Sequence, residues 1–498
     1  MNRRLIDQAT AAAPRLAAWL LLAILAAALL RHLIITLPFP YPVEYGEGVT
    51  VNWLLRYRNG LSLYPAMVDE ALPWLHNPYG PLWYILAALL QAVGGGVFNG
   101  ARALSMLGFA LCTLVIYRLA RRQLSTGGAF WITVLFAASP LLWRYALMAR
   151  VDLPALAFSL AALLMMERAW QESTDTKDRK FAVAWPWFGA GALAAAAILI
   201  KPFFIAAALT GLTVGWSDWR RRAIPFALGL VAALIPAVVW LLWRGEMEIA
   251  SHFGTMNRIG IAPILLPRIA LAGIARHPAA ILLLVGALLR PDRASPTRWF
   301  AVFSLLVFLG AIKVGADVHY FIGPLAAGAV IGPALVKKWQ QTRSEHFVSW
   351  CLAAQLMLYL PIAPRPVFTA TYGQEIPTGH AALTPTQDDR RIGRYLSEEI
   401  SGENEPILAD DPGYLLAAGR PVQIQPYQYG RLAEIGRLDC EPLRQLVKER
   451  YFALVILRHS HTGEAVDSDL PPPVVEAVLE NYNPHREIGP YIIYLPNP

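Results

Sequence analysis

Long apolar runs separated by short polar segments fill about the first three quarters of the chain. A helix rises about 1.5 Å per residue, so the run Leu16–Leu37 is long enough to cross a hydrocarbon core of about 30 Å. The pattern predicts an α-helical polytopic membrane protein with about eleven transmembrane helices. The runs assigned to them are Leu16–Leu37, Ala101–Leu119, Phe130–Leu147, Leu153–Met166, Trp187–Ile200, Phe203–Trp216, Ile224–Trp243, Ala279–Leu289, Trp299–Ile312, Phe321–Val336 and Phe347–Ile362.

Basic clusters decide which runs cross, because Lys and Arg collect in cytoplasmic loops and two crossings must separate consecutive loops of that kind. The clusters are Arg3/Arg4/Arg15, Arg118/Arg121/Arg122, Arg168–Lys180, Arg220–Arg222, Arg290/Arg293/Arg298 and Lys337/Lys338/Arg343. Three runs lie between the first two clusters, so one of them cannot cross. Pro81–Val93 is short and follows the turn-like NPYG, and it is predicted to lie in the outer interface. The N-terminus is then cytoplasmic and the C-terminus lies outside.

This topology gives residues 1–365 as a transmembrane domain with a long first external loop, 38–100. The loop begins with PVEYGEG, which places Glu44 and Glu47 directly after the first apolar run. A carboxylate beside hydrocarbon is costly unless it faces water or a substrate. The other external corners are also expected to carry polar residues, in the motifs ARVD (149–152), IKP (200–202), SHFGTMNR (251–258) and KVGADVHY (313–320). Charged groups are therefore expected to gather on one face of the membrane.

Residues 386–498 follow a different pattern, in which short apolar stretches alternate with helix-like segments. Strands are predicted for PILAD, VQIQ, ALVIL and YIIYL, and helices for RRIGRYLSEEI, GYLLAAG, EPLRQLVKERY and VVEAVLENY. The pattern is typical of a small α/β domain. Because it follows the last external crossing, it is predicted to be extracytoplasmic.

Composition supports this division. The chain has 498 residues, of which 56% are hydrophobic and 16% charged, against roughly 25% charged in soluble domains. From Asp388 onward the net charge is −7, whereas the remainder carries +15. The basic excess thus belongs to membrane loops rather than to a nucleic-acid surface. The three cysteines are far apart and form no CxxC pair, which argues against a disulfide framework or a structural zinc site.

Several motifs occur in an order that resembles a known family. After the acidic segment come GLSLYP (60–65), YGPLWY (79–84), ARALS (101–105), YRLARR (117–122) and ARVDLP (149–154). The series resembles the C-type glycosyltransferase fold, in the branch that contains protein O-mannosyltransferases and bacterial aminoarabinose and core-sugar transferases. The resemblance is strongest over 16–202. The chain has EYGEG where the family usually has Asp or Asp-Glu, and Tyr79-Gly80-Pro81 where it usually has Tyr-Pro-Pro.

The resemblance implies an inverting transfer of a sugar from a polyprenyl-phosphate carrier to a glycan, lipid or protein acceptor outside the cytoplasmic membrane. A hydroxyl acceptor needs a general base, and the family's acidic position matches Glu47 best and Glu44 second. Fixed cations would stabilise the phosphate leaving group. Arg150 and Lys201 are the first candidates and Lys313 the next, with Asp152, His319, Tyr320 and Tyr79 as further catalytic or substrate-binding candidates.

Structural alternatives stay open for these residues. The two glutamates could solvate the start of a loop, Lys201 could snorkel to the interface, and Arg150 with Asp152 could form a structural pair. Asp467-Ser-Asp469 resembles a cation-binding Asp-x-Asp motif, but a solvated loop is the preferred interpretation. No cofactor is predicted with certainty, and a divalent cation stays open. A transporter, flippase or ligase of polyprenyl-linked glycans is the alternative function; a transporter would have charges buried in mid-span and an inverted repeat.

Overall fold

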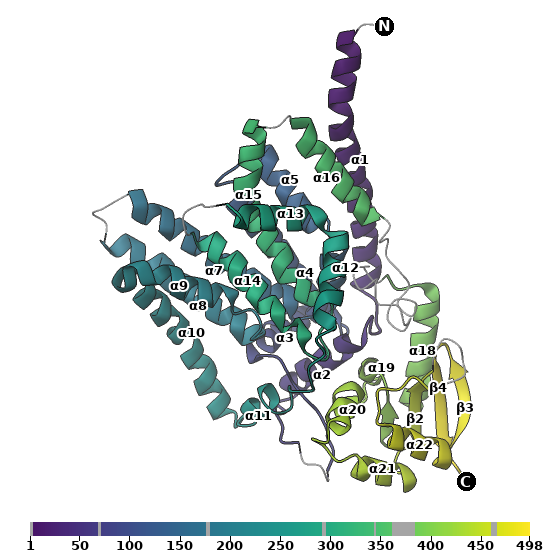
Figure 1. Cartoon of the computed structure of the whole chain (residues 1–498). Helices are drawn as coiled ribbons and strands as arrows, with labels where there is room; N and C mark the ends of the chain where they lie inside the picture. Colours follow the sequence, from purple (N-terminus) through teal and green to yellow (C-terminus); the bar gives the residue numbers. More distant parts are fainter. Residues whose placement is uncertain are drawn as a thin grey trace.

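The structure, a computed structural model, describes residues 3–67, 71–175, 180–290, 295–342, 345–360, 384–459 and 466–498. Helices make up the membrane part, and a four-stranded sheet with helices makes up the C-terminal part (Figure 1). The helices up to residue 360 are α1 (Arg3–Thr36), α2 (Tyr45–Arg58), α3 (Pro81–Gly94), α4 (Asn99–Ala120), α5 (Thr126–Ala137), α6 (Pro140–Ala146), α7 (Asp152–Asp175), α8 (Lys180–Ile200), α9 (Ala206–Gly215), α10 (Ile224–Trp243), α11 (Ile249–Phe253), α12 (Leu265–Arg276), α13 (Pro278–Leu288), α14 (Pro296–Phe308), α15 (Ile322–Thr342) and α16 (Glu345–Tyr359).

Each predicted apolar run falls on one or more of these helices within the described residues. Five helical segments are long and apolar enough to cross a membrane: Ala13–Thr36, Asn99–Ala120, Asp152–Glu172, Ala206–Trp243 and Val318–Gln341. Two bent helix pairs and four shorter apolar helices, α3 among them, add to these. The chain is therefore a multi-pass membrane protein. The number of crossings and the interfacial placement of α3 stay predictions.

Two predicted runs differ from the structure at prolines. The run Phe130–Leu147 is broken between α5 and α6, which meet at 66°, because Pro140 has no N–H to continue the first helix. The run Ala279–Leu289 is preceded by α12, an amphipathic helix that the sequence analysis did not predict. The pair α12 and α13 is bent by 105° at His277-Pro278.

The C-terminal part contains the strands β1 (Ile407–Ala409), β2 (Leu454–Arg458), β3 (Tyr482–Ile488) and β4 (Tyr491–Pro496) in the order β1-β2-β4-β3. The pair β1–β2 is parallel and the other two pairs are antiparallel. The helices are α18 (Gln387–Gly402), α19 (Pro412–Ala417), α20 (Pro426–Glu434), α21 (Glu441–Lys448) and α22 (Pro472–Asn481). Strand β3 and helix α20 were not predicted. The predicted strand VQIQ is wrong, because its only bridge joins Ile424 to Trp74 outside the sheet.

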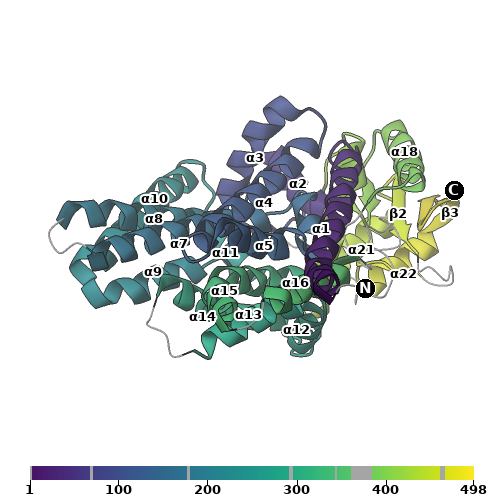
Figure 2. The same ribbon diagram turned by 90° about the horizontal axis from the view of Figure 1, so that it is seen from above.

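The membrane part and the C-terminal part share buried apolar contacts. One cluster joins Trp74 and Ile259 to residues of the C-terminal sheet and helices. The backbone of Trp74 exchanges hydrogen bonds with Gln423 and Gln425, at 2.8 and 3.3 Å. Seen from above, α8, α9 and α10 form one end of the molecule and the C-terminal part lies toward the other (Figure 2). Residues 386–498 therefore pack against the loops before α3 and α12, although their status as a separate domain stays a prediction.

Candidate active site

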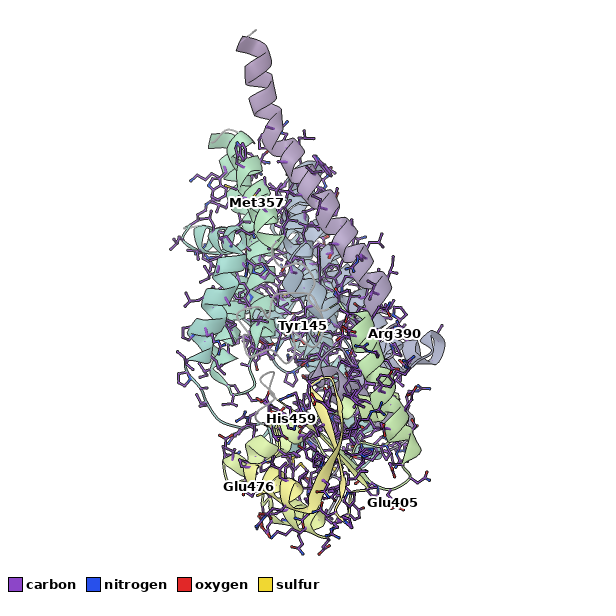
Figure 3. The ribbon with its side chains drawn as sticks, turned by 90° about the vertical axis from the view of Figure 1, so that its right-hand side faces the viewer. Tyr145, Met357, Arg390, Glu405, His459 and Glu476 are labelled. Carbon is purple, nitrogen blue, oxygen red and sulfur yellow. The ribbon has the colours of Figure 1, made fainter. Side chains whose placement is uncertain are left out.

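A cavity of about 1140 Å³ lies where loops at one end of the membrane helices meet the C-terminal part. Its wall comes from six regions: the start of α2, the loop before α3, the end of α6 with Arg150, helix α12, the loop before α15, and the C-terminal residues Gln425, Tyr427, Gln428, Arg431, Arg458 and Asp469. Figure 3 shows Tyr145 in the lower half of the helical part, with His459 of the C-terminal part below it. The cavity thus joins the part of the chain that crosses the membrane to the part that follows it.

Glu47 does not line this cavity. Its side chain is fully buried in the first turn of α2, where both carboxylate oxygens accept hydrogen bonds from Arg102, at 2.8 and 2.7 Å. The backbone N–H groups of Val43 and Ala149 donate to the same carboxylate at 2.9 and 2.8 Å. The four N–H donors occupy the acceptor sites of this carboxylate, which leaves none facing a substrate in the cavity. Glu47 therefore anchors the acidic segment to α4.

Glu44, at the N-cap position of α2, lines the cavity, and its side chain is 20% exposed. Its oxygen Oε2 lies 3.3 Å from Nη1 of Arg150, which also lines the cavity. A Cβ atom on Gly46 would lie 1.8 Å from that nitrogen, so only a residue without a side chain lets Arg150 reach Glu44 across the helix start. The geometry therefore favours Glu44 over Glu47 as the carboxylate that a substrate can reach.

Asp152 and Lys201 form a buried ion pair of 2.6 Å outside the cavity lining. The Lys201 ammonium lies 5.8 to 5.9 Å from the ring centres of Tyr79, Phe203 and Tyr320. The Arg150 Nε lies 3.9 Å from Asp152. The pair therefore lies behind the cavity wall. It contacts Arg150 and Tyr79, two predicted site residues that line the cavity, and holds them in place. The prediction that Lys201 contacts phosphate directly is not supported by this placement.

The motif KVGADVHY divides between the cavity wall and the interior. His319 and Asp317 line the cavity, whereas Lys313 and Tyr320 are not part of its lining. The Lys313 ammonium donates a hydrogen bond to the side-chain oxygen of Asn257. Burial, with a smaller effect of the nearby Lys201, lowers the pKa of Lys313 to about 8. His319 packs between the rings of Tyr145 and Tyr320, at 5.7 and 4.7 Å.

The cavity also contains functional candidates that the sequence analysis missed. The additional basic groups in its wall are His76, Arg144, Arg268, Arg276, Arg431 and Arg458. Arg268 and Arg276 lie eight residues apart on α12, and only the recognition of α12 as an amphipathic helix would have paired them.

The segment around Asp469 corrects one interpretation. Asp467 is about half exposed, but the side chain of Asp469 is only 22% exposed and lines the cavity. Arg458 lies 3.5 Å from the first carboxylate and 3.7 Å from the second. The segment is held because the Asp469 carbonyl packs against Gly430, where an added Cβ would come within 2.0 Å of it. A freely solvated loop is therefore wrong for Asp469. Among the residues that the structure describes, no three His, Cys, Asp or Glu side chains gather as metal ligands.

The comparisons with known proteins agree with this fold. A family model described as dolichyl-phosphate-mannose-protein mannosyltransferase matches residues 76–243. No curated protein sequence matches significantly.

Solved structures cover nearly the whole chain. The crystal structure of ArnT from Cupriavidus metallidurans bound to undecaprenyl phosphate is similar with a TM-score of 0.63 and 15% identity, covering 95% of this chain and 97% of that chain. The apo form of the same protein is similar with a TM-score of 0.61 and 14% identity, and the coverage of both chains is the same. The Archaeoglobus fulgidus oligosaccharyltransferase tethered to an acceptor peptide is similar with a TM-score of 0.50 and 11% identity, covering 97% of this chain and 74% of that chain. The resemblance to the C-type glycosyltransferase fold is thereby confirmed at the level of the fold.

Proposed function

We propose that the protein is a membrane glycosyltransferase that moves a sugar from a polyprenyl-phosphate donor to an acceptor hydroxyl group. The observation that carries the proposal is the pair of Glu44 and Arg150 in the wall of a large cavity between membrane helices and the C-terminal part. The matched family model names a dolichyl-phosphate sugar, and a structure with the same fold holds undecaprenyl phosphate. Both are polyprenyl phosphates, which defines the donor class.

Access from the membrane supports a lipid-linked donor. Helix α12 contributes Leu265, Ile269 and Leu271 to the cavity wall, and the side chain of Leu271 is 67% exposed. The cavity is thus continuous with an apolar outer surface along which a polyprenyl chain can lie. Arg268 and Arg276 on the same helix place positive charge beside that path, where a lipid phosphate would enter.

The reaction is a single displacement. Glu44 takes the proton of the acceptor hydroxyl group while the oxygen attacks C1 of the sugar. The bond from C1 to the phosphate oxygen breaks, and the polyprenyl phosphate leaves with the bonding electron pair. Arginine side chains in the wall, Arg150 first, stabilise the charge that develops on the phosphate. One displacement at C1 inverts the configuration of the sugar.

The acceptor is proposed to bind at the end of the cavity formed by the C-terminal part. That end offers the Tyr427 ring together with Arg431, Arg458 and Asp469, groups that suit the hydroxyl groups and ring faces of a glycan. The site is proposed to lie on the outer side of the cytoplasmic membrane, with the N-terminus in the cytoplasm.

The test measures release of labelled sugar from undecaprenyl-phosphate mannose and undecaprenyl-phosphate aminoarabinose by the purified full-length chain in lipid nanodiscs. The assay follows both the labelled sugar transferred to membrane acceptors and the labelled sugar released by hydrolysis. Glu44→Gln is expected to lower the rate by about 10²–10⁴-fold while donor binding is kept. Glu405→Gln, on the exposed surface of the C-terminal part (Figure 3), is the matched control.

Glu47→Gln separates catalysis from folding. It leaves the buried Arg102 without its anionic partner, and breaking such a pair costs about 3–5 kcal/mol, so a lower Tm is expected. If Glu44→Gln turns over at the wild-type rate while Glu47→Gln keeps the wild-type Tm and loses turnover, Glu47 is the base and Glu44 is not. If the wild type releases no sugar but carries lipid-linked glycan across a bilayer, the protein is a transporter.

A further inference from the structure

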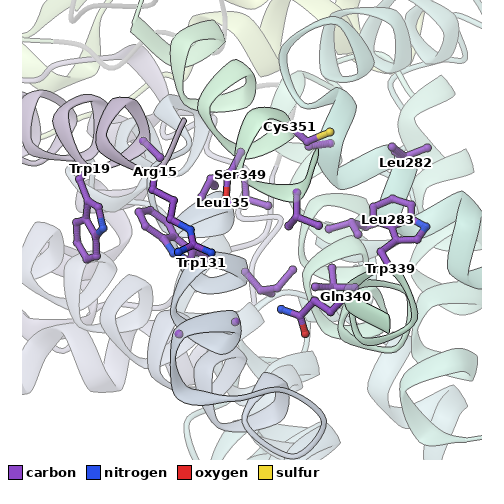
Figure 4. A pocket seen from close by; sticks show the side chains of 18 residues that line it. Arg15, Trp19, Trp131, Leu135, Leu282, Leu283, Trp339, Gln340, Ser349 and Cys351 are labelled. Carbon is purple, nitrogen blue, oxygen red and sulfur yellow. The ribbon is translucent and has the colours of Figure 1, made fainter. Parts of the chain in front are cut away.

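A second cavity, of about 310 Å³, lies at the other end of the membrane helices. Its wall is formed by α1, α5, α13, α15 and α16, and it is mostly apolar. Figure 4 shows Arg15, Trp19 and Trp131 on one side and Trp339 and Gln340 on the other. No residue of this cavity belongs to the candidate active site.

The ends of the apolar segments place this cavity at one membrane boundary. Arg15 lies two residues after the start of the span Ala13–Thr36, and Gln340 lies one residue before the end of the span Val318–Gln341. Gly127 and Gly128 lie in the first turn of α5. Glu44, in contrast, follows the opposite end of the span Ala13–Thr36. The Arg15 end of this cavity and Glu44 therefore lie at opposite membrane boundaries. The inner end of the cavity, at Ala279, lies three residues from Arg276 in the wall of the candidate active site.

The chemistry of the wall fits one class of ligand. Tryptophan side chains at a membrane boundary lie at the level of the lipid headgroups. Arg15 supplies a guanidinium group there, and Lys337 and Lys338 are exposed on the last turns of α15. Arginine binds phosphate oxygens with directed hydrogen bonds, and basic side chains at a membrane surface attract anionic lipids. An apolar cavity with a cationic rim thus matches a lipid with an anionic headgroup.

We propose that this cavity binds an anionic phospholipid, with one acyl chain between α1, α5 and α13 and its phosphate group at Arg15. The bound lipid bridges the N-terminal helix to α15 and α16, at the membrane face opposite the active site. A ligand that binds only the folded state raises its stability by mass action. Occupancy of the cavity should therefore stabilise the full chain, independently of any sugar transfer.

Thermal unfolding of the full-length protein tests the proposal, with phosphatidylglycerol or phosphatidylcholine added to mild detergent. Native mass spectrometry of the same samples counts the lipids that remain bound. Gly127→Leu adds an apolar side chain to the cavity wall, at a position where nothing lies within 4 Å of a Cβ. Arg15→Gln removes the charge. Arg118→Gln is the matched control, since Arg118 is a basic residue near the end of α4 outside the cavity wall.

Phosphatidylglycerol is expected to raise the Tm of the wild type and of Arg118→Gln more than phosphatidylcholine does, and to remain bound as at least one additional lipid. In Arg15→Gln and in Gly127→Leu, phosphatidylglycerol should raise the Tm no more than phosphatidylcholine does. Equal shifts in all four proteins would overturn the proposal. If undecaprenyl phosphate, but not phosphatidylglycerol, gives a shift that Gly127→Leu abolishes, the cavity binds the carrier instead and the phospholipid assignment is wrong.

Discussion

Glu44 and Glu47 lie three residues apart and have opposite surroundings. Glu47 is enclosed by Arg102 and two backbone N–H groups, whereas Glu44 faces the cavity beside Arg150. Burying an ion pair costs desolvation energy, so such a pair does not by itself stabilise a protein. Here Arg102 also donates to the carbonyl oxygens of Thr36, Phe39 and Tyr41. The pair therefore fixes the end of α1 and the start of α2, and this fixes the position of Glu44.

At the same scale, Asp410 predicts a pH dependence of stability. Its carboxyl group is buried beside Ser468, Arg458 and Asp469, and burial raises its pKa from 3.8 to about 7. At a pH between these two pKa values, the carboxyl group of Asp410 is protonated in the folded state and ionised in the unfolded state. The free energy of unfolding contributed by Asp410 is therefore fully present below pH 3.8 and is lost as the pH rises through about 7.

The measurement is Tm between pH 5 and 8 for the wild type, Asp410→Asn and the control Glu405→Gln. The wild type and the control should lose Tm with rising pH, and Asp410→Asn should show a flatter curve, because its amide stays neutral. Parallel curves for all three proteins would mean that Asp410 is already ionised in the folded state at pH 5.

At the scale of elements, the site depends on the contact between α2 and α19. A Cβ at Gly48 would lie 2.5 Å from the backbone nitrogen of Gly413, so the two helix starts touch backbone to backbone. Gly48→Ala should force α2 away from α19, at a cost of about 1–3 kcal/mol in folding free energy for overpacking. The shift should also displace Glu44, which lies one helical turn before Gly48, from its position in the site. We expect a lower Tm and a lower sugar-transfer rate per folded molecule.

Gly402→Ala is the matched control, because nothing lies within 4 Å of a Cβ there and alanine favours the end of α18. Both variants replace one hydrogen with a methyl group. A Gly48→Ala protein with the Tm and the rate of the wild type would show that α2 and α19 can separate without effect on the site.

Hydropathy predicted the apolar helices of the membrane part, because the backbone of an apolar helix makes its hydrogen bonds within the helix, which is a local property. It did not predict the amphipathic helix α12. Strand β3 escaped prediction because its sequence YNPHREI is mostly exposed and contains a proline, so no alternation marks it. It exists because it pairs with β4 across a short connection at Gly489-Pro490. The stretch VQIQ has the alternation of a strand, but its partner is Trp74 in the long loop between α2 and α3.

The candidate site residues were predictable only as a group. Topology brings Arg150, Asp152, Lys201 and His319 to one face of the membrane, and the ion pairs observed there agree with that expectation. Which of them reach the cavity depends on side-chain packing over long sequence distances, such as Arg102 with Glu47. That pairing reversed the preference between the two glutamates, and no pattern within PVEYGEG contains it.

At the scale of the whole molecule, the N-terminus and the C-terminal part lie at opposite ends (Figure 1). The native cysteines can test the proposed orientation, because each occupies a different level. Cys440 is half-buried at the start of α21, Cys351 lines the second cavity, which Arg15 and Gln340 also line, and Cys112 is fully buried in α4. A membrane-impermeant maleimide added from the outer side should therefore label Cys440 alone.

The experiment compares spheroplasts with lysed membranes. Labelling of intact spheroplasts should disappear in Cys440→Ser and stay unchanged in Cys351→Ser, because a reagent that cannot cross the bilayer reaches only the C-terminal part. Labelling of Cys440 only after lysis would put the C-terminal part in the cytoplasm. The cavity with Glu44 would then open on the cytoplasmic side, since the C-terminal residues Arg431, Arg458 and Asp469 form part of its wall. The orientation of one cysteine therefore decides on which side of the membrane the acceptor must be supplied.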